Sequence, residues 1–208
     1  MKEYIEKLNW RYSTKKFDPN KKLTDEQVDF LTEAMRLSAS SYGLQPYKVM
    51  LVENADIRSE LVQHSWGQKQ VADASHLIVL CNYTEVEEHL VDEYTDHMAA
   101  LRNMPAEKQE AFNKMLKDSL KNRDDVAQWA AEQNYIVLGN LLSACAFANI
   151  DACPMAGFIP EKYNKILGLN EMKLNATVVI PVGYRAADDK YAEMPKVRKP
   201  LEDFLLKK

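Results

Sequence analysis

Two short basic segments, near opposite ends of the chain, carry the residue types that bind phosphate. Arg11, Ser13 and Lys15 stand close together in the first segment, and Lys196 and Arg198 form the second. Arginine offers a forked set of donors, lysine a point charge and serine a hydroxyl, and this combination suits a phosphate group. The chain as a whole is acidic, with 27 Lys+Arg against 31 Asp+Glu, so these clusters do not follow from overall charge. The same residues would also suit two separate, solvated surface patches.

Composition limits the class of protein. The 208 residues are 46% hydrophobic and 28% charged, which is typical of a soluble globular chain. We find no repeat, low-complexity tract or linker, and therefore expect one domain over residues 1–208. No apolar run approaches the ~20 residues of a membrane helix, and no signal segment opens the chain. The mild acidity argues against nucleic-acid binding.

Three cysteines indicate the compartment. Cys81, Cys145 and Cys153 form an odd set without CxxC spacing, and each has small or apolar neighbours. This pattern favours free, buried thiols in a reducing cytoplasm over disulfides or a zinc site.

Hydrophobic patterning predicts an α+β fold with few strands and an excess of helix. Thr24 opens a capping-box helix, and Pro181 within an apolar run indicates a sheet edge or a bulge. The run over 126–149 is apolar nearly all round, as in a buried central helix. Strands are expected over 47–52, 77–83 and 175–184, and further helices over 55–64, 85–102, 105–121 and 161–167.

Several common catalytic motifs are absent. The six glycines form neither GxGxxG nor a P-loop, and there is no GxSxG or HExxH. His89, Glu93 and His97 share one predicted helix face, but the surrounding acidic residues favour a solvated face over a metal site. We therefore expect no metal, and we assign no catalytic side chain.

Five motifs in order resemble the FMN-dependent nitroreductases. They match this family in sequence order over essentially the whole chain, and the most similar group is that of the oxygen-insensitive NAD(P)H nitroreductases and dihydropteridine reductases. The motifs are RYSTKKFD from Arg11, SASSYGLQPY from Ser38, DASH from Asp73, PMAGF from Pro154, and PKVR from Pro195.

The resemblance implies the architecture and the reaction. The fold would be a central, mostly antiparallel sheet flanked by helices and completed by the C-terminal segment of the partner subunit in a homodimer. That arrangement would cover the apolar tail from Pro200. FMN would receive hydride at N5 from NAD(P)H and then reduce a small acceptor, such as a nitroaromatic, a quinone or a pterin, in a ping-pong cycle.

Site residues follow from the matched motifs. Arg11, Ser13, Lys196 and Arg198 would hold the FMN phosphate, and Lys15 would lie near the pyrimidine side of the flavin, where a cation stabilises the reduced anion. The resemblance also gives the FMN site Tyr12 and Gln70 together with Ala156 and Gly157, of which Gly157 would bring a backbone amide to N5. From the partner subunit it gives Ala39, Ser40 and Ser41.

Departures from the family pattern weaken any transfer of substrate range. Ala156 stands where the family commonly has Glu, Gly67 and Gln70 replace Asn and Lys, and Gly43 replaces Asn after the paired serines. Gln70 carries no charge, so we expect Lys15 to be the main cation at the pyrimidine end. The choice between NADH and NADPH is left open.

Alternative interpretations remain for several residues and for the reaction. Ser40 and Ser41 could merely cap a turn, and aromatic or methionine residues at helical spacing are more often core than cleft. A flavin reductase, an ene reductase or a dehalogenase could share this fold, as could a flavin-binding protein without catalysis. The residues that could line an acceptor cleft are Tyr42, Tyr47, Phe112 and Met115.

Overall fold

The apolar run in the middle of the sheet supplies two hydrophobic cores. In the computed structural model, which describes residues 1–208, β2 (His76–Tyr83) sends Leu77 and Val79 into one core and Ile78 and Leu80 into the other. Successive side chains of a strand point to opposite faces, so one continuous apolar segment can support helices on both sides.

The sheet has four strands in the order β1-β2-β4-β3, and every pairing is antiparallel. This confirms the α+β prediction. The other strands are β1 (Tyr47–Val52), β3 (Asp151–Ala152) and β4 (Leu174–Gly183). The helices are α1 (Lys2–Trp10), α2 (Asp25–Arg36), α3 (Ala55–Gln63), α4 (Gln70–Asp73), α5 (Glu88–Arg102), α6 (Ala106–Lys121), α7 (Val126–Phe147), α8 (Pro160–Ile166) and α9 (Leu201–Phe204).

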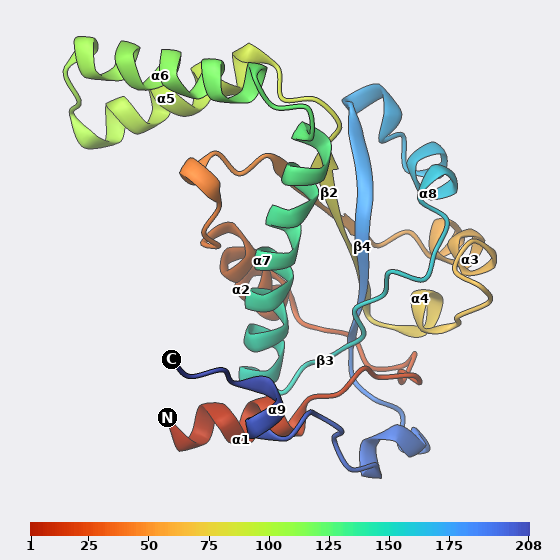
Figure 1. Ribbon diagram of the computed structural model, residues 1–208. Coiled ribbons are helices and arrows are strands. Elements are labelled where there is room, and N and C mark those ends of the chain that lie inside the picture. The colour runs from red at the N-terminus through yellow and green to blue at the C-terminus, as the bar shows by residue number, and fades with distance from the viewer.

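Helices cover both faces of the sheet. Figure 1 shows α2 and α7 on one side, and α3, α4 and α8 on the other. The helix α2 begins as predicted, because the Thr24 hydroxyl accepts from the Gln27 amide while the Gln27 side chain accepts from the Thr24 amide. All the predicted long helices are present, with bounds shifted by at most a few residues at either end.

The position of Pro181 differs from the sequence expectation. Strand β4 lies inside the sheet between β2 and β3, so the edge alternative is wrong. The strand does carry a bulge, but at Thr177 and not at Pro181, since Leu80 and Cys81 pair with Val178 and Ala176. Pro181 is tolerated inside the sheet because regular pairing with β3 stops at Ala152. The next residue, Cys153, donates its amide to the Pro181 carbonyl, and no donor is required of proline.

Helix α7 is buried on one face only, which corrects the expectation of a helix buried all round. Trp129 and Leu141 lie in the core, whereas Tyr135, Ile136 and Phe147 are exposed on the opposite face. An exposed apolar face on an otherwise well-packed helix indicates a surface that another chain can cover.

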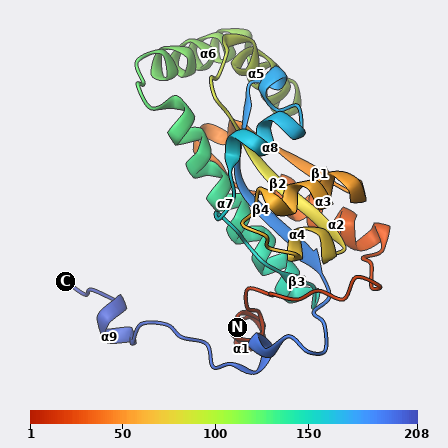
Figure 2. The ribbon, with the colours of Figure 1, turned by 90° about the vertical axis from the view of Figure 1, so that its right-hand side faces the viewer.

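Two parts project from the body of the molecule. Helices α5 and α6 form an arm at one end, joined to the body by a small core that includes Leu116 and Trp129 (Figure 1). At the other end the C-terminal tail leaves the body altogether (Figure 2), and its Phe204 and Leu206 are 75% and 93% exposed. No helix combines the length and the apolar character needed to cross a bilayer.

Candidate functional site

The two basic segments converge. The chain after α1 passes beside the segment that follows β4, and together they enclose a cavity of about 320 Å³. Short contacts join them, including a hydrogen bond from the Lys196 ammonium to the Arg11 carbonyl. The convergence excludes the alternative of two separate patches. The cavity residues that the sequence predicted are Arg11, Tyr12, Ser13, Lys15, Lys196 and Arg198.

The cations in this cavity lack a carboxylate partner. Burial, and then the charge of Arg198, lower the pKa of Arg11. Burial also lowers the pKa of Lys196, and the charges of Arg11 and Arg198 add to the effect. None of the chain's ion pairs includes Arg11, Lys15, Lys196 or Arg198. Arg11 and Lys196 are partly buried, whereas Lys15 and Arg198 are exposed, and neighbouring cations that repel one another favour an anion between them.

Asp189 shapes the wall of the cavity. Its carboxylate accepts hydrogen bonds from the Lys15 amide at 2.9 Å, the Lys16 amide at 3.2 Å and the Tyr12 hydroxyl at 3.0 Å. Burial would raise the pKa of Asp189, but these hydrogen bonds and that from Tyr191 outweigh it, so the pKa lies below its ordinary value. The ionised carboxylate thus fixes the backbone that presents Ser13 and Lys15.

Lys15 lines the basic cavity and also contacts Cys153, which belongs to a second group of candidate residues. Its ammonium lies 3.8 Å from the Cys153 sulfur. Burial raises the pKa of the Cys153 thiol, although Lys15 and Gln70 oppose the shift. The thiol therefore stays neutral and leaves the Lys15 charge unneutralised.

Gln70, which lies beside Cys153, is linked to Gly157 through Gln68. Gln70 is only 6% exposed and donates to the Gln68 side chain, which in turn donates to the Gly157 carbonyl. The Trp66 ring covers Gly157, since a Cβ atom at position 157 would lie 2.7 Å from it. Ala156 is exposed beside this group.

The structure separates the loop of Ala39, Ser40 and Ser41 from the basic cavity, because none of the three lines it. The Ser40 hydroxyl accepts from the Gln45 amide at 2.9 Å within the same loop, and it does not cap the helical turn over Ser41–Gly43. The Ser41 amide is already bonded to the Gln133 side chain at 2.9 Å. A ligand that contacts this loop must therefore hydrogen-bond to groups other than the Ser41 amide.

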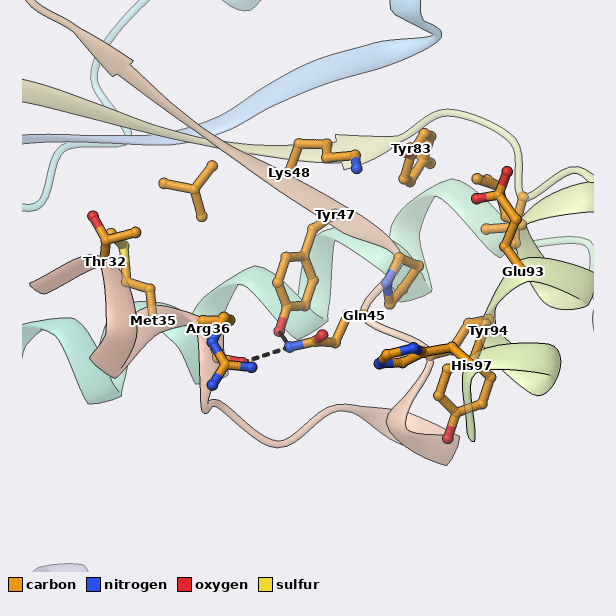
Figure 3. Close-up of a pocket in the computed structure, with 15 residues that line it drawn as sticks. Thr32, Met35, Arg36, Gln45, Tyr47, Lys48, Tyr83, Glu93, Tyr94 and His97 are labelled. Carbon is orange, nitrogen blue, oxygen red and sulfur yellow. Dashed lines mark hydrogen bonds between the residues drawn. The ribbon is translucent and has the colours of Figure 1, made fainter. Parts of the chain in front are cut away.

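A larger pocket lies beside this loop, between α2, β1 and α5 (Figure 3). It has a volume of about 560 Å³, and Gln45 crosses its floor to reach the Arg36 carbonyl and the Tyr47 hydroxyl. Glu93 and His97 line it, but no group of three potential ligands in the chain could hold a metal ion.

The residues considered for an acceptor cleft divide into two kinds. Tyr47 is 8% exposed, and Phe112 packs against the small core of the arm. Tyr42 and Met115 are each 43% exposed. Tyr47 nevertheless lines the larger pocket, and Tyr42 and Met115 are the more exposed of the four residues.

Sequence reasoning missed four residues that organise the site. Trp66 and Gln68 act through contacts with a distant segment, and Asp189 through backbone amides. Arg58 is buried and donates to the carbonyls of Val71 and Ser75 at 3.0 and 2.8 Å, and also to those of Ala72 and Ala74. It thereby fixes the segment that carries Gln70. Its only sequence signal was a charged residue within a helix that packs on the sheet.

The chain is similar to known nitroreductases in sequence and in structure. The model of the "Nitroreductase family" matches residues 8–184. The chain is 35% identical over 214 residues to "Putative NAD(P)H nitroreductase YfkO" of Bacillus subtilis, covering 97% of this chain and 95% of that protein. The solved structure of the "putative nitroreductase ydfN" of Bacillus subtilis superposes with a TM-score of 0.90 at 20% identity, covering 100% of both chains. A "putative nitroreductase in complex with FMN" of Exiguobacterium sibiricum superposes with a TM-score of 0.82 at 18% identity, covering 99% and 97% of the two chains.

Proposed function

Because the chain belongs to the nitroreductase family, an FMN-dependent family of oxidoreductases, we propose that it transfers hydride from NAD(P)H to a small acceptor with FMN bound at the basic cavity. The observation that carries this proposal is the cluster of cations without carboxylate partners that Arg11, Lys196 and Arg198 form around one cavity. A phosphate monoester carries about −1.5 to −2 charges at pH 7 and would neutralise them.

The residues fit FMN in kind and in order. Arg11, Ser13, Lys196 and Arg198 would bind the phosphate, and Tyr12 would form part of the wall of the cavity. Lys15 borders the basic cavity and also contacts Cys153. This position supports placing the isoalloxazine ring of FMN between Lys15 and Gly157. Gln70 and Ala156 border this region.

The side chains of the protein would provide charge and orientation for the bound FMN. When bound, FMN supplies the ring that takes hydride from NAD(P)H and passes it to the acceptor. Lys15 places a positive charge where it favours the anionic reduced ring. The indole of Trp66 lies over Gly157 and would border the ring there. No side chain of this group needs to act as an acid or base.

A homodimer is part of the proposal. The exposed apolar face of α7 and the exposed tail both require a cover. The outer edge of β1 is free, which supports pairing with the tail of a second copy. In such a dimer the partner's Ser40 and Ser41 loop would complete the FMN site. We place the protein in the cytoplasm, where its three free cysteines would stay reduced.

The first experiment is an absorption spectrum of the purified protein, followed by anaerobic addition of NADH and NADPH in turn. We expect flavin peaks that bleach with at least one nucleotide. Reoxidation by a panel of nitroaromatic, quinone, pterin and enone compounds would then identify the acceptor class. A flavin that neither nucleotide bleaches would favour a binding protein, and failure to take up FMN would overturn the proposal.

A further inference from the structure

The loop over residues 64–70 is fastened to the segment over residues 157–159. The Ile159 amide donates to the His64 carbonyl at 2.9 Å, and the Gln68 side chain donates to the Gly157 carbonyl at 3.1 Å. Between these two bonds the Trp66 ring lies against Gly157. Three contacts in succession hold the two segments as one unit.

The hydrogen bonds fix which way each amide side chain points. A backbone carbonyl can only accept, so the NH₂ group of Gln68 must face Gly157. The Gln68 oxygen then faces the other way, and it accepts from the Gln70 NH₂ group at 3.1 Å. The order of donors and acceptors therefore runs in one direction from Gln70 through Gln68 to Gly157. The Gln70 side-chain oxygen takes no part in these two hydrogen bonds.

Gly157 depends on these neighbours for its orientation. Glycine lacks a Cβ atom, so the peptide groups on its two sides rotate more freely than those of other residues. Gln68 holds the carbonyl of Gly157 and Trp66 covers its Cα, which restricts that rotation. The loop reaches this position through left-handed backbone at Trp66 (φ 55°) and Gly67 (φ 72°). Such conformations cost free energy at a non-glycine residue and gather at functional sites.

We infer that Gln68 is a positioning residue of the cofactor site. It links the Gly157 peptide and the Gln70 amide into one hydrogen-bonded unit, so that the two border the flavin ring in a fixed relation. This inference rests on the proposed function, because it takes Gly157 and Gln70 to border the ring. Gln68 itself supplies orientation, and no proton or electron passes through it.

The test replaces Gln68 with residues that break one bond or both. Gln68→Glu keeps an acceptor for Gln70 but, when ionised, cannot donate to the Gly157 carbonyl. Once protonated, the introduced carboxyl donates again. Gln68→Met has a similar length and makes neither bond. Gln63→Glu is the matched control, since Gln63 is exposed one turn earlier and its side chain makes no hydrogen bond.

FMN affinity of each variant is measured by flavin fluorescence from about pH 8 to about pH 5, across the range in which a buried carboxyl titrates. We expect Gln68→Glu at pH 8 to bind FMN about three- to tenfold more weakly than Gln63→Glu, as for loss of one hydrogen bond. The difference in FMN affinity between Gln68→Glu and Gln63→Glu should disappear as the pH falls. Gln68→Met should show a loss that does not depend on pH.

The flavin midpoint potential gives an independent readout. At pH 8, Gln68→Glu should have a lower potential than Gln63→Glu, because only the first puts a negative charge beside the ring. If wild type binds FMN but Gln68→Glu matches Gln63→Glu in affinity at every pH, the inference is wrong and the proposed function stands. If wild type binds no FMN, both are overturned.

Discussion

The hydroxyl of Tyr94 occupies the space that a side chain at Gly43 would need. A Cβ atom at position 43 would lie 2.6 Å from the Tyr94 oxygen, which itself donates to the Tyr42 carbonyl at 2.6 Å. Helix α5 of the arm thus holds the turn that follows Ser41. Gly43 also has a φ of +76°, in the left-handed region. The glycine at position 43 is therefore coupled to a tyrosine in the arm.

The Gly43→Ala variant should lose more stability than Gly67→Ala. Both glycines have left-handed backbone, so each change costs about 1 kcal/mol in strain, but nothing lies within 4 Å of a Cβ at Gly67. Gly43→Ala must also displace Tyr94 from its hydrogen bond. In a Tyr94→Phe background the extra loss of stability of Gly43→Ala over Gly67→Ala should vanish. Urea unfolding of the two glycine variants, each with and without Tyr94→Phe, would measure it. Equal costs for the two glycines in wild type would refute the coupling.

Replacing Lys15 should lower the flavin midpoint potential. Lys15 is the cation nearest the Cys153 group, and its charge favours the reduced, anionic ring. We expect Lys15→Ala to lower the potential by about 30 mV, equivalent to about 1.4 kcal/mol for two electrons. Lys16→Ala is the control, since Lys16 is paired with Asp188. Redox titration against reference dyes measures both, and an unchanged potential in Lys15→Ala would remove Lys15 from this role.

Asp189→Asn should weaken both FMN binding and the folded state. An amide cannot accept from all the donors that surround the carboxylate, and one buried mismatch costs about 1–3 kcal/mol. The pKa of Asp189 is lowered in the folded state. Its stabilising effect is therefore present above the unfolded pKa of about 3.9 and lost as the pH falls through the folded pKa.

The difference in unfolding free energy between wild type and Asp189→Asn should accordingly be constant at neutral pH and shrink below about pH 4. Chemical unfolding over a series of pH values provides the measurement. The neighbouring exposed Asp188→Asn should behave like wild type in FMN binding. A difference that grows on acidification would show that Asp189 is not held ionised.

The three thiols should be inert in the folded protein. Burial raises the pKa of Cys81 and of Cys145 to about 12, and it also raises that of Cys153. Thiolate is the reactive form, so a disulfide reagent at pH 8 should label none of them in the native protein within minutes. Unfolding in denaturant should release three thiols. Rapid labelling of native Cys153 would mean that the site beside Lys15 is open to solvent.

Removal of residues 200–208 should weaken self-association. The tail exposes Leu201, Phe204 and Leu206 in the single chain, and burial of even one such side chain is worth about 1.5 kcal/mol, or more than tenfold in affinity. Sedimentation at several concentrations measures the dissociation constant. A chain that keeps the tail but carries Lys207→Ala and Lys208→Ala controls for charge. An unchanged constant after truncation would place the dimer contact elsewhere.

Local signals predicted most of the fold. The capping box at Thr24 and the continuous apolar run of β2 act through neighbours in sequence, and both elements form where expected. The residue types around Arg11 and Lys196 were likewise a local signal, and they indicated an anion site. The assignment of FMN needed the ordered resemblance, since phosphate is common to many ligands.

Long-range side-chain contacts could not be predicted. Gln68 meets Gly157 across 89 residues and Asp189 meets Lys15 across 174. Tyr42 and Trp66 adopt left-handed backbone that their residue types disfavour. Pro181 indicated an edge or a bulge, but the neighbouring strand β3 ends early and leaves the proline inside the sheet. In each case a distant segment decides the outcome, and sequence patterns carry no record of it.

In the proposed complex, the repulsion between Arg11, Lys196 and Arg198 would link FMN binding to the amount of folded protein. In the free chain these like charges oppose folding, whereas a bound phosphate turns them into attractive partners. A ligand that binds only the native state shifts the folding equilibrium in proportion to its concentration above the dissociation constant. In that complex, the fraction of chains that escapes proteolysis would track the FMN concentration of the cell, so that a shortage of FMN would lower the enzyme's abundance as well as its occupancy.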